Sequence, residues 1–354
     1  MGVAGSLVSS TEALVYPPRV TIADVARAAG VSKTAVSFAF NAPERLSRAT
    51  LERIQEVSHR LGYTPDPTAR ALSIRRSGTI GLLIPQGLNT VFANPFLSEL
   101  IRGVGEVCEE HDLMLVLVPP LNGSLKQAMQ RAPVDAFISL GLSADDPELA
   151  TLHRLGLPSV LVDSDGSAGD PVVNVDDAAG AEAAGRHLLS LGHRRIAFIV
   201  LPRARSQQEL TPVAARRLSG YQTALAGSDA PEPVTVRAEA TVSAGEQAFR
   251  ELARRRPRPT AVLAMSDMAA IGFMQAARDA GLRVPDDFSV VGYDDVPMAA
   301  WTNPPLTTVR QPMVRKGALA ARLLIDRLGG AAAASPVQLP TELVVRASTG
   351  RARG

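Results

Sequence analysis

Seven short apolar runs recur between residues 79 and 295, and stretches with helical spacing separate them. The runs are TIGLLIP, LMLVLVP, AFISLG, SVLVD, RIAFIVL, TAVLAMSD and FSVVGYDD. Apolar runs bounded by turns are typical of strands buried in a parallel sheet, and the helices between them complete βαβ units. The order of runs repeats, first from 79 to about 175 and then to about 295. We therefore predict two similar doubly wound α/β lobes.

Ligands of doubly wound sheets bind outside the carboxyl ends of the strands, so polar residues near those ends are candidates for a binding site. They are Asn94, Asp163, Arg217, Asp267, Asp294 and the aromatic residue Trp301. Carboxylates accept two hydroxyl hydrogen bonds and a guanidinium donates a fork of them, which suits a sugar ring. Simpler interpretations stay open. Asn94 and Asp163 can cap helices. Arg217 and Asp294 can pair to brace the cleft, and Trp301 can serve packing alone.

A different pattern precedes the sheets, in the segment VTIADVARAAGVSKTAVSFAFN at residues 20–41. It contains two short helical patterns separated by Gly30, with Thr21 and Ser32 as their caps. Isolated helices shorter than about 12–15 residues are marginal in water, so these two must pack on a neighbour. A third helix is predicted at 48–61, closed by Gly62. Together they make a helix-turn-helix unit.

The second of these helices has two faces. Val36 and Phe40 form its inward stripe. The outward face carries Lys33, Thr34, Ser37 and Phe38.

Charge is distributed unevenly along the chain. Residues 20–78 carry nine Lys and Arg against five Asp and Glu, although the whole chain has a net charge of only +2. A small basic unit joined to a large acidic one indicates a nucleic-acid-binding module, although a basic surface without function is common. The single cysteine, Cys108, excludes an internal disulfide framework, and the histidines show no metal spacing. We expect no cofactor, no metal site and no catalytic residue.

No apolar run reaches the roughly 18 residues that span a membrane, and residues 1–19 lack the features of a signal peptide. We expect a disordered tail there and a cytoplasmic, nucleoid-associated protein without membrane contact.

The motifs VTIADVARAAGVS, LGYTPDPTARAL, TIGLLIP, ANPF, LGHRRIAFI, RLSGY, AMSDMAAIG, GLRVPDDFSVVGYDD, PPLTTVRQP and ELVVRAST occur in this order. On them the chain closely resembles the lactose-repressor/galactose-repressor family of bacterial transcription regulators, from Val20 to about Thr349. The resemblance implies an all-α helix-turn-helix headpiece, a hinge helix and a two-lobed sensor like periplasmic sugar-binding proteins. It also implies a homodimer on a near-palindromic operator DNA, and an effector that changes operator affinity.

The resemblance assigns roles in the headpiece. Lys33 and Thr34 match the main base readers, because a recognition helix reads base edges with its N-terminal residues. Ser32, Ser37 and Asn41 match phosphate contacts, which fix register rather than sequence. Two departures are Ala35 and Phe38, where the family commonly has Thr and Arg. Losing that arginine removes a guanine contact worth about 1–3 kcal/mol of discrimination. Phe38 is expected to be exposed, where it can meet a thymine methyl, rather than to fold back as core.

In the hinge, Leu72 matches a leucine that wedges into the DNA minor groove, where such a wedge unstacks a base step and bends the duplex. Packing inside its own hinge helix is the alternative. In the sensor, Arg217 and Asp294 match positions that hold ligand hydroxyls or a polar heterocycle. The predicted function is a repressor released by a small polar effector, a sugar or its derivative.

Three alternatives are weighed against this function. A regulator of purine type would use its effector as co-repressor. A plain solute-binding protein would need an export signal and no basic headpiece. An enzyme would need a phosphate loop or nucleophile motif, and neither occurs. The chain ends at RARG without a leucine heptad, so a dimer is expected rather than a tetramer.

The predicted organisation follows from these patterns. It comprises a tail at 1–19, a headpiece at 20–66, a hinge helix and linker at 67–78, a first sensor subdomain at 79–175 and 307–332, and a second at 176–306 and 333–348.

Overall fold

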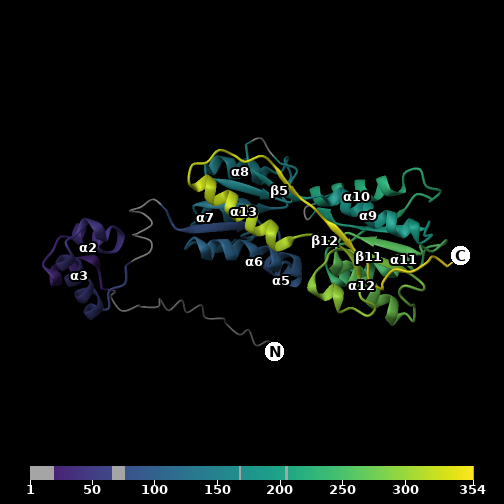
Figure 1. Cartoon of the computed structure of the whole chain (residues 1–354), viewed down its shortest axis with the longest axis horizontal. Coiled ribbons are helices and arrows are strands. Elements are labelled where there is room, and N and C mark those ends of the chain that lie inside the picture. Colours follow the sequence, from purple (N-terminus) through teal and green to yellow (C-terminus); the bar gives the residue numbers. More distant parts are fainter. Residues whose placement is uncertain (1–19, 66–75, 167–168, 204–205, 354) are drawn as a thin grey trace, which may run out of the picture. The chain divides into compact units, whose positions relative to one another are not determined.

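The computed structural model describes residues 20–65, 76–166, 169–203 and 206–353. The chain divides into two compact units, Met1–Ser77 and Gly78–Gly354 (Figure 1). The predicted tail and most of the predicted hinge, Leu72 included, lie outside the described residues. Across the ranges that are described, no helix has the length and apolar character needed to cross a membrane.

The first unit has the predicted helix-turn-helix arrangement. Its elements are α1 (Ile22–Ala29), α2 (Lys33–Asn41), the 3-10 turn η1 (Pro43–Arg45) and α3 (Arg48–Leu61). Thr21 caps α1 in a reciprocal pair with Asp24, whose carboxylate accepts the backbone N–H of Thr21 at 3.0 Å. Gly30 ends that helix with φ 63°, a left-handed conformation that side chains resist. The sharp turn lets α1 and α2 share one core.

That core is small and apolar. It is formed by Val25, Ala26, Ala29, Val36, Ala39, Ile54 and Val57, all buried. The predicted inward residues of α2 both meet this core, because Val36 is buried in it and Phe40 packs against it. Phe40 is half-buried and its ring lies 5.7 Å from that of Tyr63, beyond the end of α3. Ala39 is a further buried residue of α2 that the prediction did not include.

The second unit contains two six-stranded sheets. The first sheet has the order β13 (Val337–Leu339), β5 (Val172–Val175), β4 (Ser159–Val162), β3 (Ala136–Leu140), β1 (Thr79–Leu83), β2 (Met114–Val118). The second has the order β14 (Glu342–Val344), β12 (Thr307–Arg310), β11 (Ser289–Asp294), β10 (Ala261–Ala264), β6 (Ile196–Val200), β9 (Val234–Arg237). All neighbouring strands are parallel except β12 and β14. A two-stranded hairpin, β7 (Pro202–Arg203) and β8 (Ser206–Leu210), follows β6.

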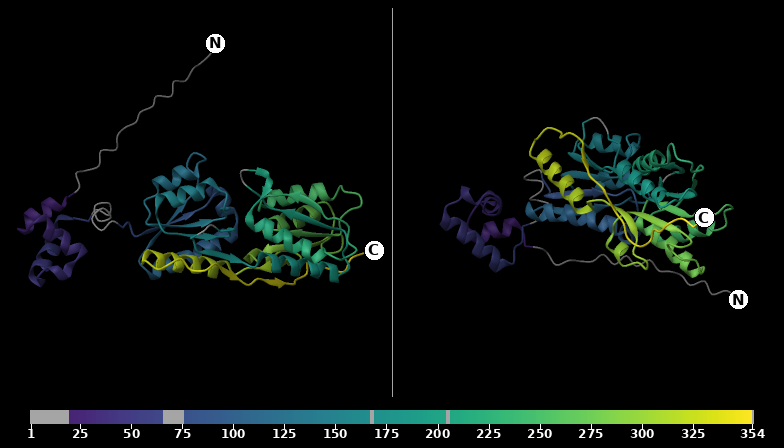
Figure 2. Two further views of the ribbon diagram at one scale, coloured as in Figure 1. Left: turned by 90° about the horizontal axis from the view of Figure 1, so that it is seen from above. Right: turned by 45° about the vertical axis from the view of Figure 1, so that its right-hand side comes forward.

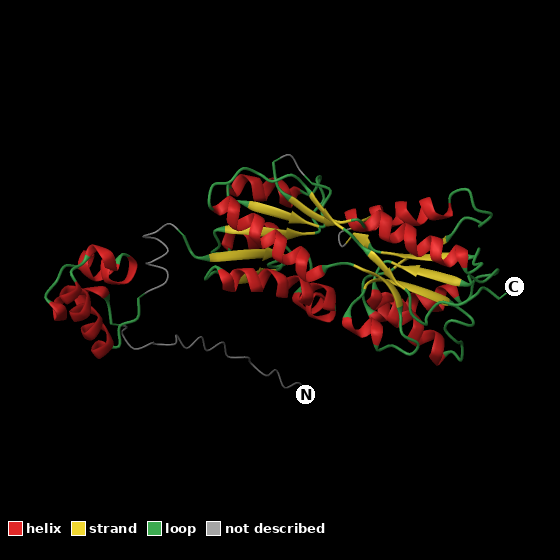
Figure 3. Cartoon of the chain, viewed as in Figure 1, coloured by secondary structure: helices red, strands yellow, loops and turns green. Residues whose placement is uncertain are grey.

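Each sheet is covered by helices on both faces, as Figure 3 shows. The first lobe has α5 (Leu88–Ala93), α6 (Pro95–Glu110), α7 (Leu125–Arg131), α8 (Pro147–Leu155) and α13 (Met313–Leu328). The second has α9 (Asp177–Ser190), α10 (Pro212–Leu225), α11 (Val242–Leu252), α12 (Asp267–Asp279) and the turn η2 (Pro297–Ala300). Along β1, Ile80 and Leu82 face one core while Leu83 faces the other. This alternation confirms strands buried on both sides.

The two sheets match strand for strand. Reading each order from its first strand, β4 occupies the place in the first sheet that β11 occupies in the second. All seven predicted runs contain a strand. The prediction missed β5, β9 and the strands beyond residue 300. Several of these lie at or near sheet edges, where exposed positions interrupt the apolar pattern.

The predicted subdomain boundaries are wrong at two places. Strand β12, predicted in the first subdomain, pairs with β11 in the second sheet. Strand β13, predicted in the second subdomain, pairs with β5 in the first sheet. The chain therefore crosses between the lobes after β5, after β12 and after β13. The left view of Figure 2 shows α13 along one side of the first lobe, with the chain running on to the second. Periodicity cannot locate these crossings, because strand pairing decides them.

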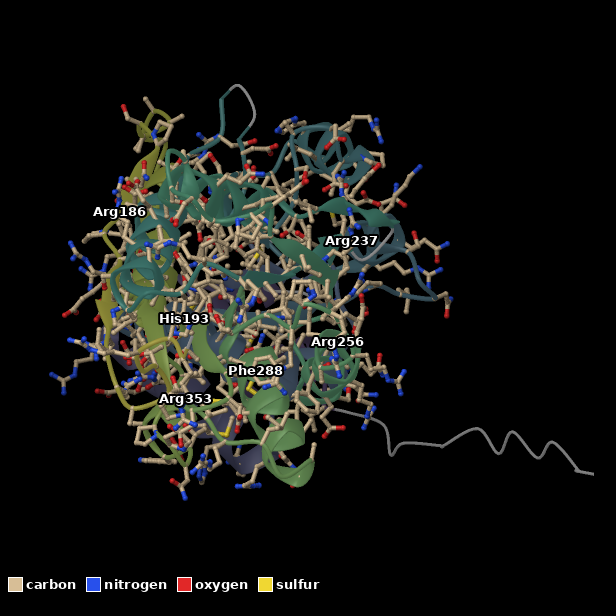
Figure 4. The ribbon with its side chains drawn as sticks, turned by 90° about the vertical axis from the view of Figure 1, so that its right-hand side faces the viewer. Arg186, His193, Arg237, Arg256, Phe288 and Arg353 are labelled. Carbon is tan, nitrogen blue, oxygen red and sulfur yellow. The ribbon has the colours of Figure 1, made fainter. Side chains whose placement is uncertain are left out.

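The C-terminal residues are fixed to the second lobe by His193, which is 2% exposed. Its Nε2 lies 3.0 Å from the carbonyl oxygen of Gly350, and its Nδ1 lies 2.9 Å from Oγ1 of Thr260. Burial lowers the pKa of this imidazole. Figure 4 shows His193 within this lobe, while Arg186 and Arg353 lie nearer its edge. His193 is thus a structural residue.

Helices α6 and α13 pack closely through glycine. A Cβ placed on Gly103 would lie 2.0 Å from the carbonyl oxygen of Val314 in α13. A Cβ on Gly105, also in α6, would have no neighbour within 4 Å.

We expect Gly103→Ala to destabilise the chain by about 1–3 kcal/mol, because the two backbones must separate. Gly105→Ala should be neutral, or stabilise by up to about 1 kcal/mol through helix propensity. Urea unfolding measures the change in the free energy of unfolding for both variants. Equal changes for Gly103→Ala and Gly105→Ala would contradict the close packing of α6 on α13.

Candidate functional site

The exposed face of α2 is the first candidate site. Ser32 caps the helix, since its Oγ accepts the N–H of Ala35 at 3.1 Å. Val36 and Ala39 turn inward, so Lys33 and Thr34 are left exposed in the first turn. The free N–H groups and positive dipole of a helix N-terminus attract phosphate, and an exposed lysine beside them adds to that attraction. The sequence folds this way because Val36 and Ala39 lie on the side of α2 that faces the core.

The remaining predicted contacts of this helix lie along the same face or beside it. Asn41 is exposed and donates from Nδ2 to Oγ of Ser37 at 3.3 Å. Phe38 is half-buried rather than fully exposed, with the guanidinium of Arg45 lying 5.2 Å from its ring centre. Phe38 is not among the residues that pack on the headpiece core. Its ring therefore covers the surface between α2 and η1, where a cation–π contact holds it.

The second candidate site begins with two aspartates at equivalent strand ends. Asp163 directly follows β4 and Asp294 ends β11. Both are nearly buried, at 6% and 5% exposure. Both have positive φ, 55° and 123°, which costs energy for a residue with a side chain. Strain of this kind persists where the surrounding structure imposes it, and it clusters at ligand sites.

A lysine and a glutamine join the two aspartates. Nζ of Lys316, in the first turn of α13, lies 2.8 Å from both carboxylate oxygens of Asp163. The same ammonium donates to Oε1 of Gln311 at 2.8 Å. Gln311 then donates from Nε2 to Oδ1 of Asp294 at 2.6 Å. We call this chain of four side chains the interlobe bridge, because Asp163 belongs to the first lobe and Asp294 to the second.

Arg217, from α10, meets the second-lobe end of the bridge. It is 4% exposed, and its Nη2 lies 3.7 Å from Oδ1 of Asp294. Its Nε donates to Asp177 at 2.9 Å and its Nη1 to the carbonyl of Met265 at 2.6 Å. The guanidinium also lies 3.5 Å from the ring centre of Tyr293. Arg217 is therefore held rigidly on all sides, with its charge directed at Asp294.

The neighbouring Arg216 makes a second contact between the lobes. Its Nη1 lies 3.4 Å from the carbonyl oxygen of Ser164, which follows Asp163 in the first lobe. Its Nε donates to Oδ2 of Asp177 at 3.0 Å. Asp177 thus receives two guanidinium groups, one on each oxygen. This arrangement orients both arginines toward the junction of the lobes.

Asp267, another predicted effector residue, makes its contacts beside the bridge. It is completely buried, accepts the N–H of Val296 at 2.9 Å and accepts the hydroxyl of Thr308 at 2.5 Å. Burial raises its pKa to about 8, and the neighbouring charge of Asp294 adds to this effect. Burial also raises the pKa of Asp294, to about 6, against the opposing charge of Arg217. Asp267 thus braces the loop after β11, and burial favours its protonated form.

Two further predicted residues lie outside the bridge. Asn94 caps α6, where its Oδ1 accepts the N–H of Phe96 at 3.1 Å. Trp301 follows η2 with 80% of its surface exposed, so it is not buried packing within this chain.

Sequence reasoning missed Lys316, Gln311 and Asp177. Gln311 lies in the PPLTTVRQP motif, and Asp177 lies just after a strand that the sequence did not reveal. A lysine in an amphipathic helix is normally expected on the solvent-exposed face, so the sequence pattern did not indicate that Lys316 is buried.

The bridge and its arginines can hold a polar ligand by hydrogen bonds. Carboxylate oxygens accept from hydroxyl groups, while the amide and guanidinium groups donate to them. In the parts of the chain that are described, no group of three or more His, Cys, Asp or Glu side chains could hold a metal ion.

Comparisons with known proteins place these two sites in context. Residues 21–66 match the family model described as bacterial regulatory proteins, lacI family, and residues 186–349 match a periplasmic binding protein-like domain. The HTH-type transcriptional regulator CelR of Thermobifida fusca is 36% identical over 347 residues, covering 93% of this chain and 98% of CelR.

Two solved structures are similar over the whole length. The structure of a CelR–cellobiose complex has a TM-score of 0.70 at 32% identity, covering 93% of this chain and 100% of that chain. A lac repressor dimer bound to operator and the anti-inducer ONPF has a TM-score of 0.80 at 27% identity, covering 94% and 100%.

The raised pKa of Asp267 gives a pH prediction. Its ordinary value is 3.8 and its folded value about 8, so the folded chain binds an extra proton between these limits. The stability that Asp267 contributes is therefore present at low pH and lost as the pH rises through this window. Asp267→Asn removes that proton. Relative to the variant, the wild type should lose up to about 1.4 kcal/mol per pH unit between about pH 5 and 8.

Urea unfolding at a series of pH values measures this difference. Asp279→Asn is the control, because Asp279 is exposed at the other end of α12. Parallel pH curves for wild type and Asp267→Asn would show that Asp267 is ionised in the folded chain.

Proposed function

The chain belongs to the lacI family of bacterial regulatory proteins, and we propose that it is a repressor that a small uncharged sugar releases from its operator. It is a DNA-binding transcriptional regulator with a two-lobed sensor. The observation that carries the proposal is the exposed first turn of α2 on a helix-turn-helix unit. The same chain holds a buried, strained pair of aspartates between two lobes.

We assign DNA contact to α2 and the residues beside it. Lys33 and Thr34 are exposed at its N-terminal end, where a recognition helix meets base edges. Ser32, Ser37 and Asn41 supply short donors for phosphates. Phe38, which replaces the common arginine, offers an apolar ring for a thymine methyl. Leu72 remains the proposed minor-groove wedge, on sequence grounds alone.

We propose that the effector binds at the interlobe bridge. Arg217 and Asp294 are its proposed contacts in the second lobe, and Asp163 in the first. The complex of the relative CelR with cellobiose supports a sugar. An effector shifts the lobe arrangement only through its differential affinity for the two states. Asp163 and Lys316 of the bridge are placed by the first lobe, and Gln311 and Asp294 by the second, so the polar groups that an effector meets depend on how the lobes are arranged.

Exposed apolar side chains support a homodimer. On the second unit, Met114 in the edge strand β2 is 62% exposed, Phe92 in α5 is 66% exposed and Trp301 is 80% exposed. Exposed apolar residues mark a partner surface when they form one contiguous patch, and the similar lac repressor was solved as a dimer bound to operator. A twofold pair of headpieces then fits a near-palindromic operator. Trp301 therefore has two proposed roles, contact with the second subunit of a homodimer and stacking on the sugar.

The role of Lys33 can be tested directly. Lys33→Ala should relax the sequence preference at one operator position, at a cost of about 1–3 kcal/mol for the preferred base. In vitro selection of bound DNA, followed by mobility shifts on the selected sites, measures this preference. Lys126→Ala, an exposed lysine of α7 in the sensor, is the matched control and should leave the preference intact. A uniform loss on every sequence, with a smaller salt dependence, would reassign Lys33 to phosphate.

The role of Asp294 in effector binding gives another prediction. Asp294→Asn should weaken effector binding about tenfold to hundredfold, because a charge-assisted hydrogen bond contributes roughly 1.5–3 kcal/mol. Operator affinity without effector should stay unchanged, because Asp294 lies outside the headpiece. Calorimetry with the sugar that most stabilises the wild type measures the first quantity, and a mobility shift the second. Asp326→Asn, exposed on α13, is the control.

The same experiment separates an inducer from a co-repressor. If the sugar is an inducer, the Asp294→Asn variant remains bound to its operator when the sugar is present. If the sugar is a co-repressor, the variant binds its operator weakly when the sugar is present. If Asp294→Asn folds and binds the effector as tightly as the wild type, then Asp294 only braces its loop.

A further inference from the structure

The burial of Lys316 is the feature that sequence reasoning did not foresee. Its side chain is 0% exposed, in a helix whose inward face is otherwise apolar or small. An ammonium group taken out of water costs several kcal/mol unless it is paired and hydrogen-bonded. A methionine or leucine would fill the same space at no such cost. The charge of Lys316 therefore needs a reason beyond packing.

All three ammonium protons of Lys316 have acceptors. Two are taken by the carboxylate oxygens of Asp163 and the third by Oε1 of Gln311, each at 2.8 Å. The ring centre of Phe96 lies 4.8 Å from Nζ on another side. Lys316 thus fixes the position of a strained aspartate and the orientation of an amide. Because its oxygen is bound to Lys316, Gln311 must direct its NH₂ group toward Asp294.

Gln311 lies where the chain passes from one lobe to the other. It directly follows β12, which belongs to the second sheet, and precedes α13, which packs on the first. The charges of Lys316 and Asp163 reach far enough to act on the pKa of Asp294. The four side chains of the interlobe bridge are therefore one electrostatic unit that spans both lobes.

The charges around the bridge balance. The cations are Lys316, Arg216 and Arg217, and the carboxylates that pair with them are Asp163, Asp177 and Asp294. Asp267 is bonded separately to Val296 and Thr308, and burial raises its pKa and so favours its uncharged form. Asp295, the next carboxylate along β11, is neutralised separately by Arg310 and Arg346 at 2.7 and 2.6 Å. The site as a whole is neutral and each charge already has its partner.

We propose that Lys316 and Gln311 are specificity-determining residues of the effector site. Through them the neutral interlobe bridge accepts an uncharged polyhydroxyl ligand and rejects its carboxylate or phosphate analogue. This inference rests on the proposed function of the same site. Hydroxyl groups can donate to Asp163 and Asp294 while both stay ionised. An anionic ligand would meet these carboxylates with no spare cation, because Asp163 already neutralises Lys316. The uncompensated buried charge would oppose binding.

Substitutions that change the net charge should therefore change ligand selectivity in a defined order. Asp163→Asn keeps the shape but leaves the ammonium of Lys316 unpaired, so the site becomes positive. Lys316→Met keeps the length but leaves Asp163 unpaired, so the site becomes negative. The double variant Lys316→Met with Asp163→Asn is neutral again. A merely structural role for the pair predicts weaker binding of every ligand, without any dependence on ligand charge.

The test uses the full chain and matched ligands. Cellobiose is compared with cellobionate, and glucose with gluconate and glucose 6-phosphate, first by thermal shift and then by calorimetry. In the wild type, at least one uncharged sugar should bind about tenfold or more tightly than its anionic partner. Asp163→Asn should reverse this preference through gained affinity for the anion. Lys316→Met should bind the uncharged sugar about tenfold to hundredfold more weakly. The double variant should again disfavour the anion.

Several outcomes would overturn the inference. The first is that the wild type binds the anionic analogue as tightly as the uncharged sugar. The second is that no uncharged sugar stabilises the wild type. The third is that Asp163→Asn gains no affinity for the anionic analogue. Lys126→Met serves as the control for loss of one positive charge at a distant exposed site. Operator binding is measured in parallel by mobility shift. A chain that selects uncharged sugars but shows no ligand-dependent operator binding would contradict the proposed function while leaving this inference intact.

Discussion

The ion pair between Asp163 and Lys316 is the contact on which the organisation of the sensor depends. It closes the first lobe at the end of β4, orients Gln311 and so sets the position of Asp294 in the second lobe. A buried pair of this kind adds little net stability, because desolvation offsets most of the attraction. The pair contributes to the geometry of the site, because Asp163, Lys316 and Gln311 have only one arrangement in which every donor and acceptor is satisfied. Removing one partner would leave the other charge buried alone.

The internal repeat of the fold explains why the site forms where it does. Strands β4 and β11 occupy equivalent places in their sheets, so the repeat brings one aspartate from each lobe to the same junction. Both adopt positive φ, which costs energy and must be imposed by the loops around them. The crossing segment between β12 and α13 then inserts Gln311 between the two aspartates. Gln311 lies beside Asp294 in the second lobe, so the bond from Lys316 to Gln311 is the one that joins groups placed by different lobes.

The headpiece depends on a simpler constraint. Two helices of eight and nine residues are too short to persist alone, so the small core around Val25, Val36 and Ile54 must hold them. Once Val36 and Ala39 of α2 are used for that core, the opposite face, which carries Lys33, Thr34 and Phe38, remains for DNA. The sensor and the headpiece are separate compact units, each with its own core.

The family resemblance singled out the candidate pair of Arg217 and Asp294. The sequence by itself determined the helix-turn-helix unit and the seven central strands. Local patterns suffice for these, because caps, helical spacing and apolar runs act over a few residues. It assigned β12 and β13 to the wrong lobes and gave no hint that Lys316 is buried. Tertiary structure decided both, since only pairing in the folded sheets shows that β12 joins β11 and that β13 joins the distant β5, and Asp163 is 153 residues from Lys316. A buried lysine and a solvated one have the same local sequence pattern. Only the folded chain brings the carboxylate that makes burial of the lysine tolerable.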